Sequence, residues 1–359
     1  MRRYIYFYFP GEKGSVMKNR IGYIDIARGI AMICIVLGHL GNANINRVVF
    51  TFHVPIFFLI TGYFISDKQT MIEFIKKKIR TLIVPYIITC SVIIVLAVIF
   101  AFPSEGLGGV KTAIYDWGYA SLYGAGDNYT ERFYIKAIGA LWFLWATFWG
   151  SVLLRIALKL EGMLRILFVC GIACAGYISC RLFWFPLSIQ AGCGALLFMY
   201  IGYLYGQEKS LFDNLSKETK CFLLIAACII WMSFIKNFQG FWLVHFHIGR
   251  GVIDIFSCLC ACICVLEISK LVEHFMPKIS KGIEFLGRNS LLLLCVHIIE
   301  LNLFPWIAWL EKLTEIGMPE NWLLGFLIVG KLVFDISVTV VCAHCNFIRK
   351  AYGLRVDEN

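Results

Sequence analysis

The chain has 359 residues, of which 60% are hydrophobic and only 16% are charged. A soluble domain carries about 25% charged residues, so this composition excludes a soluble globular protein, and its apolar content also excludes an intrinsically disordered one. The apolar runs are about 17–22 residues long, enough to cross about 30 Å of hydrocarbon as helices. They lack the strict alternation of barrel strands. The sequence therefore predicts an all-α, polytopic helical bundle in a membrane.

About ten apolar segments are predicted to span the membrane. In chain order they are 21–41, 49–66, 81–102, 138–158, 164–181, 186–206, 221–236, 250–270, 286–304 and 321–345. The longest predicted connection runs from 102 to 138. Residues 17–350 are expected to form one membrane domain, which follows an extension of no assigned role (1–16) and precedes a cytoplasmic tail (351–359). Met17 is an alternative start to Met1.

The distribution of the 33 Lys and Arg residues predicts the orientation. Most of them fall on the side that contains the N-terminus, and cytoplasmic loops carry such an excess. Both termini are therefore expected in the cytoplasm, in a multi-pass protein of the plasma membrane (the inner membrane, if bacterial). The net charge of +10 is explained by this bias, so no nucleic-acid partner is expected.

Three ionisable residues lie inside the first predicted span. Arg28 and His39 are eleven residues apart, which places them on one helix face about 16 Å apart along the axis, and Asp25 lies one turn from Arg28. Ionisable groups inside a membrane are costly and mark functional sites. Histidine is the natural general base near neutral pH. The alternative is a structural Asp25–Arg28 salt bridge with a histidine at a helix end.

Two further motifs follow the first span. His53 precedes Pro55, which suits the first turn of the second span, and it can line a pocket or sit in an interfacial aromatic belt. Lys76, Lys77, Lys78 and Arg80 form a cationic cluster that faces the cytoplasm. Such a cluster binds phosphorylated ligands, or it acts as a topogenic block near anionic lipid.

In combination, these motifs resemble the acyltransferase type 3 family of integral membrane acyltransferases. Arg28 and His39 match its Arg-x10-His motif, and residues 52–63 resemble its aromatic His-x-Pro-x-Phe-Phe block. Lys77 and Arg80 resemble its basic Arg-x-x-Arg motif, with lysine in the first position. A lysine still contacts a phosphate, but it loses the bidentate geometry of arginine.

Two later blocks agree with this resemblance, which covers about residues 17–350. Residues 141–144, with Trp142, resemble the family's Trp-Phe-Leu segment, and residues 286–290 with His297 resemble its Leu-Gly-x-x-Ser…His stretch. Leu294 stands where the family commonly has a tyrosine.

The resemblance implies an O-acyltransferase that moves an acyl group, acetyl in the simplest case, from acyl-CoA to a hydroxyl of a cell-surface or lipid-linked carbohydrate. It implies catalysis at His39 with Arg28 and Asp25. Acetyl-CoA is then expected at Lys76, Lys77, Lys78 and Arg80, and the expected pocket residues are His53, Trp142, Ser290, His297 and Glu300.

No metal is expected. The fifteen cysteines lie mostly inside predicted spans, and residues two apart on a helix cannot surround one ion. Lys331 and Asp335 are four residues apart in the last span, and this spacing predicts a structural bridge between them.

A multi-span transporter or flippase of a glycan or small solute is the alternative function, because paired intramembrane charges also suit a proton-coupled carrier. The chain shows no symmetry between its halves, which argues against this alternative. The outer segment 102–137 is rich in glycine and tyrosine with interleaved carboxylates. Its aromatic faces suit a sugar or an interfacial belt.

Overall fold

The computed structural model describes residues 21–66, 68–130 and 134–354. The expectations for residues 1–16, for Met17 and for the end of the tail lie outside this part of the chain. The described residues are almost entirely helical, which confirms the all-α class. Two short strands, β1 (Phe241–Trp242) and β2 (His247–Ile248), pair in antiparallel fashion.

Sixteen α-helices are present in the described residues, with one π-helix (η1) and two 3₁₀ turns (η2 and η3). In chain order they are α1 (Gly22–Gly38), α2 (Ala43–Val49), α3 (Pro55–Tyr63), α4 (Met71–Lys78), η1 (Ile79–Ile83), α5 (Val84–Tyr123), α6 (Trp142–Ala157), α7 (Gly162–Ser179), η2 (Pro186–Ser188), α8 (Ile189–Gln207), α9 (Lys209–Asp213), α10 (Lys217–Lys236), η3 (Leu243–His245), α11 (Val252–Phe275), α12 (Pro277–Arg288), α13 (Ser290–Leu303), α14 (Trp306–Glu315), α15 (Glu320–His344) and α16 (Asn346–Ala351).

Each of the predicted spans falls on a helix. Among the described residues, six helical stretches are long and apolar enough to cross a membrane, and the pair α12 and α13, bent by 74°, raises the number to seven if it is one broken span. The first, second and fourth predicted spans correspond to the shorter helices α1, α3 and α6. The protein is therefore a multi-pass membrane protein, while the count of ten spans and the orientation stay predictions.

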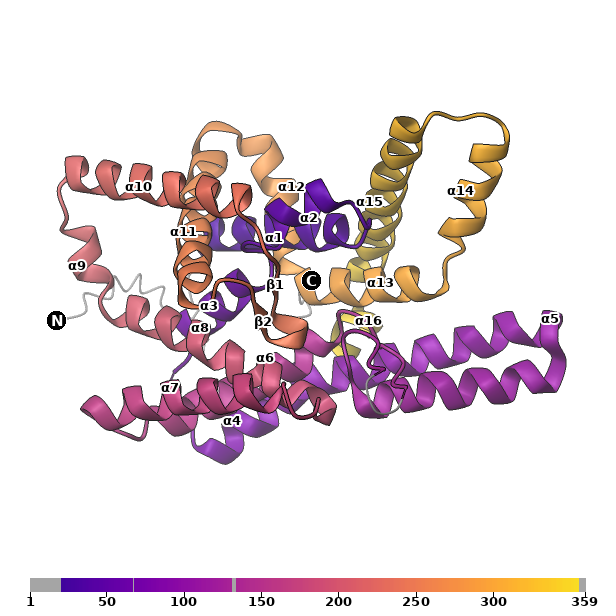
Figure 1. Ribbon diagram of the computed structural model, residues 1–359, viewed down its shortest axis with the longest axis horizontal. Coiled ribbons are helices and arrows are strands. Elements are labelled where there is room, and N and C mark those ends of the chain that lie inside the picture. Colours follow the sequence, from indigo (N-terminus) through magenta and orange to yellow (C-terminus); the bar gives the residue numbers. More distant parts are fainter. Residues whose placement is uncertain (1–20, 67, 131–133, 355–359) are drawn as a thin grey trace, which may run out of the picture.

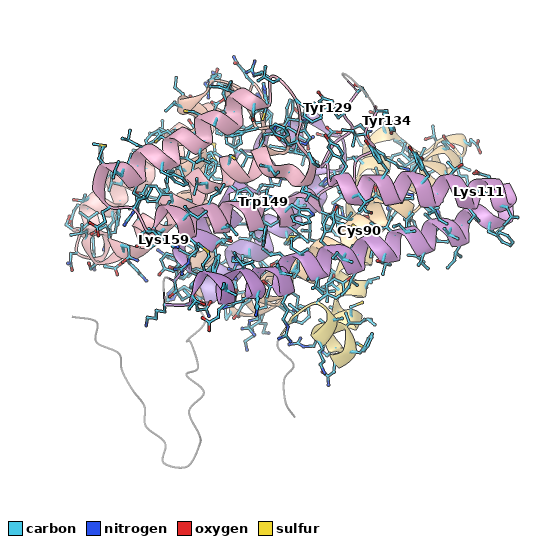
Figure 2. The ribbon with its side chains drawn as sticks, turned by 90° about the horizontal axis from the view of Figure 1, so that it is seen from below. Cys90, Lys111, Tyr129, Tyr134, Trp149 and Lys159 are labelled. Atoms are coloured by element: carbon cyan, nitrogen blue, oxygen red, sulfur yellow. The ribbon has the colours of Figure 1, made fainter. Side chains whose placement is uncertain are left out.

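The segment after residue 102 differs from its prediction as a connection. The helix α5 continues to Tyr123 and folds back on itself at Gly106, which has a φ of 59°. The result is a long helical hairpin that projects from the bundle (Figure 1), with Lys111 near its far end and Cys90 nearer the body (Figure 2). Glycine adopts this left-handed conformation without the penalty of a Cβ atom, which explains the reversal there.

The helices divide into a central group and a lipid-facing group. The central helices α1, α3, α6, α8 and α13 bury most of their side chains in one core cluster. The peripheral helices α7 and α10 each bury only two residues, although their sequences are apolar. An apolar helix with an exposed surface is the arrangement expected in contact with lipid. The N-terminal helices α1 to α3 lie in the middle of the molecule (Figure 1).

Close backbone contact joins α1 to α12. A Cβ atom at Gly287 would overlap the backbone carbonyl of Asp25, and one at Gly29 would overlap the backbone of Ile283. Small residues allow membrane helices to approach at this distance. The glycine of the predicted 286–290 block is thereby explained, because it brings α12 against the polar part of α1.

We expect Gly287→Ala to destabilise the protein by about 1–3 kcal/mol, because the added methyl group forces the backbones of α1 and α12 apart. Gly282→Ala on the same helix is the matched control, since its methyl group would meet no atom within 4 Å. Thermal unfolding of the two variants in one detergent measures the difference. Equal melting temperatures would contradict the close contact.

Candidate active site

The polar stripe predicted on the first span is present on α1. The guanidinium Nη1 of Arg28 donates to Oδ1 of Asp25 over 3.3 Å, so the expected ion pair forms. Arg288, the last residue of α12, places its Nε 3.8 Å from the other carboxylate oxygen of Asp25. Asp25 is buried, and it therefore holds two guanidinium groups from two helices in place.

His39 caps the C-terminal end of α1 and faces a second histidine. Its Nδ1 donates to the backbone carbonyl of Ile35 over 2.8 Å. The same Nδ1 lies 3.4 Å from Nε2 of His297 on α13, and the two rings meet edge to face with centroids 5.1 Å apart. The structure thus brings together a residue of the first span and a residue of the ninth, 258 positions apart.

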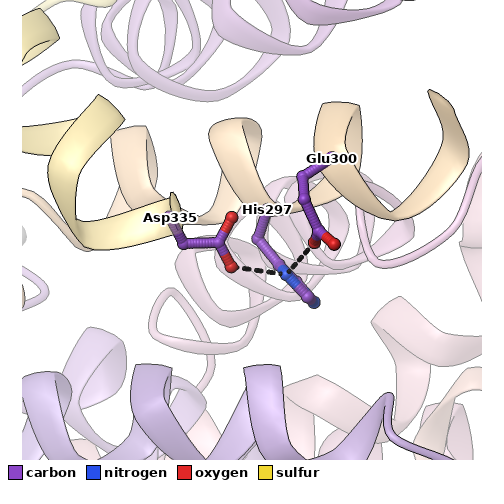
Figure 3. Close-up of side chains that lie close together, drawn as sticks. All are labelled: His297, Glu300 and Asp335. Carbon is purple, nitrogen blue, oxygen red and sulfur yellow. Dashed lines mark hydrogen bonds and ion pairs between the residues drawn. The ribbon is translucent and has the colours of Figure 1, made fainter. Parts of the chain in front are cut away.

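Two carboxylates contact His297 at Nδ1, the ring nitrogen that does not face His39. Its Nδ1 lies 2.9 Å from Oδ2 of Asp335 on α15 and 3.1 Å from Oε2 of Glu300, one turn along α13 (Figure 3). All three side chains are buried. The N–H at Nδ1 donates to Oδ2 of Asp335, so Nε2 of a neutral His297 is the atom that accepts from His39.

Lys331 binds Glu300, which corrects the prediction that it pairs with Asp335. Its Nζ lies 2.6 Å from Oε1 of Glu300, and the indole Nε1 of Trp306 donates to the same oxygen. Spacing along one helix identified two neighbours, but the partner of each lies on α13. The other carboxylate oxygens, Oε2 of Glu300 and Oδ1 of Asp335, accept no hydrogen bond in the described structure.

The ligand-type atoms of His297, Glu300 and Asp335 lie within 4.8 Å of one another. This spacing alone would suit a metal ion, but the ammonium of Lys331 already lies against Glu300 and supplies a positive charge there. The side chains therefore fit a network of ion pairs and hydrogen bonds.

The other three residues predicted to line the pocket lie in different parts of the fold. The Nδ1 of His53 donates to the carbonyl of Val49 over 2.7 Å, and its ring packs edge to face on Phe50. Trp142 is buried at the start of α6, where a side chain at Gly126 would collide with its indole. Ser290 begins α13 at the bend after α12.

The predicted basic cluster forms an exposed surface next to α1. Lys76 and Lys77 are exposed at the end of α4, and Arg80 is exposed on η1. A π-helix inside a helical stretch often marks a functional position. Lys78 is close enough to Arg28 for their positive charges to repel, so the cluster and the stripe on α1 form one cationic region.

Arg155 on α6 holds the segment that leads into this cluster. Its two terminal nitrogens donate to the carbonyls of Ser66 and Gln69 over 2.9 and 2.6 Å, and its guanidinium lies 5.3 Å from the ring centroid of Phe74 on α4. The arginine is buried, so it positions α4 and does not itself extend the exposed cluster.

A cleft of about 350 Å³ opens between the connections after α5, α7 and α10. It is lined by residues that include Tyr129, Arg181, Trp184 and His245. The Nε2 of His245 donates to Oδ2 of Asp127 over 3.0 Å, and this hydrogen bond holds the pKa of the Asp127 carboxyl below its usual value. The cleft combines aromatic faces with charged and polar groups.

Sequence reasoning identified His39, His297 and Glu300 but treated Lys331 and Asp335 as structural. The position of these two residues inside an apolar span could have indicated a functional role, because intramembrane charges mark functional sites. The pair Asp127 and His245 had no such pattern, since it joins connections 118 residues apart.

The fold and this centre define a multi-pass membrane protein with a buried histidine pair and a cationic region at one end of α1. Residues 21–342 match the family described as "Acyltransferase domain". Because this match covers most of the chain, the protein belongs to that family, whose activity is the transfer of acyl groups. The resemblance drawn from the motifs is therefore confirmed.

Two relatives are each named nodulation protein NolL. The protein from Sinorhizobium fredii (strain NBRC 101917 / NGR234) is 25% identical over 267 residues, which are 66% of this chain and 65% of that relative. The protein from Mesorhizobium japonicum (strain LMG 29417 / CECT 9101 / MAFF 303099) is 26% identical over 153 residues, 38% of this chain and 36% of the relative. The chain thus spans less than two thirds of either relative. No solved structure matches the chain.

We expect Lys331→Met to destabilise the protein by about 3–5 kcal/mol, because it leaves the Glu300 carboxylate buried without its cation. Adding Glu300→Gln in the same chain removes that charge and recovers part of the loss. Thermal unfolding of the two single variants and the double variant measures this coupling. Additive losses would show that the two side chains do not interact.

Proposed function

We propose that this protein transfers an acyl group, acetyl in the simplest case, from acyl-CoA to a hydroxyl of a cell-surface or lipid-linked carbohydrate at the plasma membrane. The observation that carries the proposal is the contact between His39 and His297, backed by two buried carboxylates. Acyl transfer to a hydroxyl needs a base for the hydroxyl proton and a stabiliser for the developing oxyanion.

His39 is the proposed base. Because its Nδ1–H donates to the carbonyl of Ile35, the lone pair of the neutral ring is on Nε2. That atom takes the proton of the acceptor hydroxyl as the hydroxyl oxygen attacks the thioester. His53, Trp142 and Ser290 are proposed to line the substrate pocket.

The cationic region is the proposed donor site. Acyl-CoA carries several phosphates, and charge-assisted hydrogen bonds to phosphate are among the strong ones. Lys76, Lys77, Lys78 and Arg80 would hold these phosphates at the cytoplasmic end. Arg28, fixed by Asp25, would then bind a donor phosphate or polarise the thioester carbonyl, and the reaction needs no metal ion.

The outer cleft is the proposed entry for the carbohydrate. Aromatic faces such as those of Tyr129 and Trp184 stack on sugar rings, and carboxylates such as Asp127 accept from sugar hydroxyls. The segment that follows leads toward the centre, because Gly139 lies against Ile298, the neighbour of His297 on α13. The acceptor would therefore reach His39 from the side opposite to the donor.

We expect His39→Ala to lower acetyl transfer by about 10²–10⁴-fold, the usual contribution of a general base. The assay incubates the purified full chain in lipid nanodiscs with ¹⁴C-acetyl-CoA and a lipid-linked glycan fraction from cells that lack the protein. His344→Ala is the matched control, because the Nδ1 of His344 also donates to the carbonyl four residues earlier. Normal transfer by His39→Ala at normal abundance would remove His39 from the mechanism. Glycan movement without label would instead support a carrier.

We expect Lys77→Ala combined with Arg80→Ala to raise the KM for acetyl-CoA about tenfold or more, because each charged hydrogen bond contributes about 1.5–3 kcal/mol. The value of kcat should change little, since these cations act on donor binding. Lys278→Ala with Lys281→Ala is the control, two exposed cations with the same spacing on α12. An unchanged KM for acetyl-CoA would assign the cluster to topology or lipid binding.

A further inference from the structure

The buried face of α15 is polar although the helix is apolar in composition. Only four residues of α15 are buried, namely Lys331, Asp335, Thr339 and Ala343, one per turn. Apart from Ala343, the apolar residues of the helix are exposed or half-buried. A helix that packs only for stability buries its apolar face, so a charged inner face requires a different explanation.

The charges around His297 balance only when one additional proton is present. Lys331 neutralises Glu300, with which it pairs, and Asp335 faces a histidine that is uncharged in its neutral form. With neutral His297 the buried group carries one net negative charge, and protonation of His297 brings the charge to zero. Burial in low dielectric therefore favours the uptake of one proton by this group.

Unused hydrogen-bond acceptors lie in the same place. Oε2 of Glu300, Oδ1 of Asp335 and Oγ1 of Thr339 are buried and accept no hydrogen bond in the described structure. A buried acceptor without a donor is costly. Two of these atoms belong to the carboxylates that contact His297, so the cluster has capacity for an added proton.

The hydrogen bond between the two histidines has a defined direction, from His39 to His297. Both rings carry their hydrogen on Nδ1, that of His39 because it donates to Ile35 and that of His297 because it faces carboxylates. The Nδ1–H of His39 is therefore shared between the carbonyl of Ile35 at 2.8 Å and the Nε2 lone pair of His297 at 3.4 Å. A proton that arrives at Nε2 of His39 can be passed on as the Nδ1 proton leaves toward His297.

We propose that His297, Asp335 and Glu300 form a proton store that holds the acceptor's hydroxyl proton between attack and release of CoA. This inference rests on the proposed function of His39 as the base. The store takes the proton through His39 and later returns it through the same ring. His297, Asp335 and Glu300 are positioning residues, because they act on the reaction through His39.

The step balances without another reactant. The O–H bond of the acceptor breaks as its oxygen bonds to the acyl carbon, and the C–S bond of the thioester then breaks with its electron pair on sulfur. The stored proton moves to that sulfur and gives the free thiol of CoA. No oxidant, reductant or net proton is required.

The groups around the two rings explain why the charge moves away from His39. His39 interacts electrostatically with His53 before α3 and with Lys331 on α15, whereas His297 touches two carboxylates. A positive charge is therefore better stabilised on His297 than on His39.

The test replaces Asp335 by Asn, which keeps the shape of the side chain but removes the negative charge that faces Nδ1 of His297. We expect kcat for acetyl transfer to the lipid-linked glycan fraction to fall about 10²-fold or more. The KM for acetyl-CoA should stay unchanged, and the pH profile of kcat should be displaced. Asp335→Glu restores the carboxylate and should recover part of kcat with the original pH profile.

Asp254→Asn on α11 is the control. Asp254 is an equally buried carboxylate, and it pairs with Arg250 in the connection just before α11. It should leave the pH profile of kcat in place even where it lowers stability. An Asp335→Asn variant with the kcat and pH profile of the unchanged protein would overturn the store while leaving His39→Ala as a separate test of the base. One bound divalent metal ion per chain, absent from Asp335→Asn in elemental analysis, would also overturn it.

Discussion

The buried contact between α1, α13 and α15 is the constraint on which the rest of the structure depends. Charged side chains in a membrane interior persist only when they are paired, and here Glu300 is paired with Lys331 and Asp335 with His297. These pairs hold α15, most of whose other side chains are exposed or half-buried, against the core. The same contact places His297 against His39. The ion pairs that hold the helices together therefore also position the two histidines.

Local spacing predicted the parts of this centre that lie on one helix. The separation of eleven positions put Arg28 and His39 on one face of the first span, and the pairing of Asp25 with Arg28 followed from their separation of three. Partners on different helices could not be predicted in this way. Lys331 and Asp335 satisfy the spacing rule for a bridge, yet each finds a better partner on α13, because tertiary contacts override a weak pair along one helix.

The helical class and the position of the apolar helices also followed from the sequence, since hydrophobic length is a strong constraint in lipid. The hairpin of α5 was not predicted, because the glycines and tyrosines between 102 and 123 are typical of a connection between helices. Only one glycine there, Gly106, actually reverses the chain, and the tyrosines continue as a helix. Composition reports the average of a segment, whereas a reversal depends on a single φ angle.

The break between α12 and α13 links the two ends of the centre. Gly287 lets α12 lie against α1, so that Arg288 reaches Asp25 near the cationic region. The chain then bends by 74° and α13 carries His297 to the far end of α1. One short segment therefore sets the distance between the proposed donor cations and the histidines. A thioester held at both ends needs that distance to be fixed, because misplacement of reacting groups lowers the rate steeply.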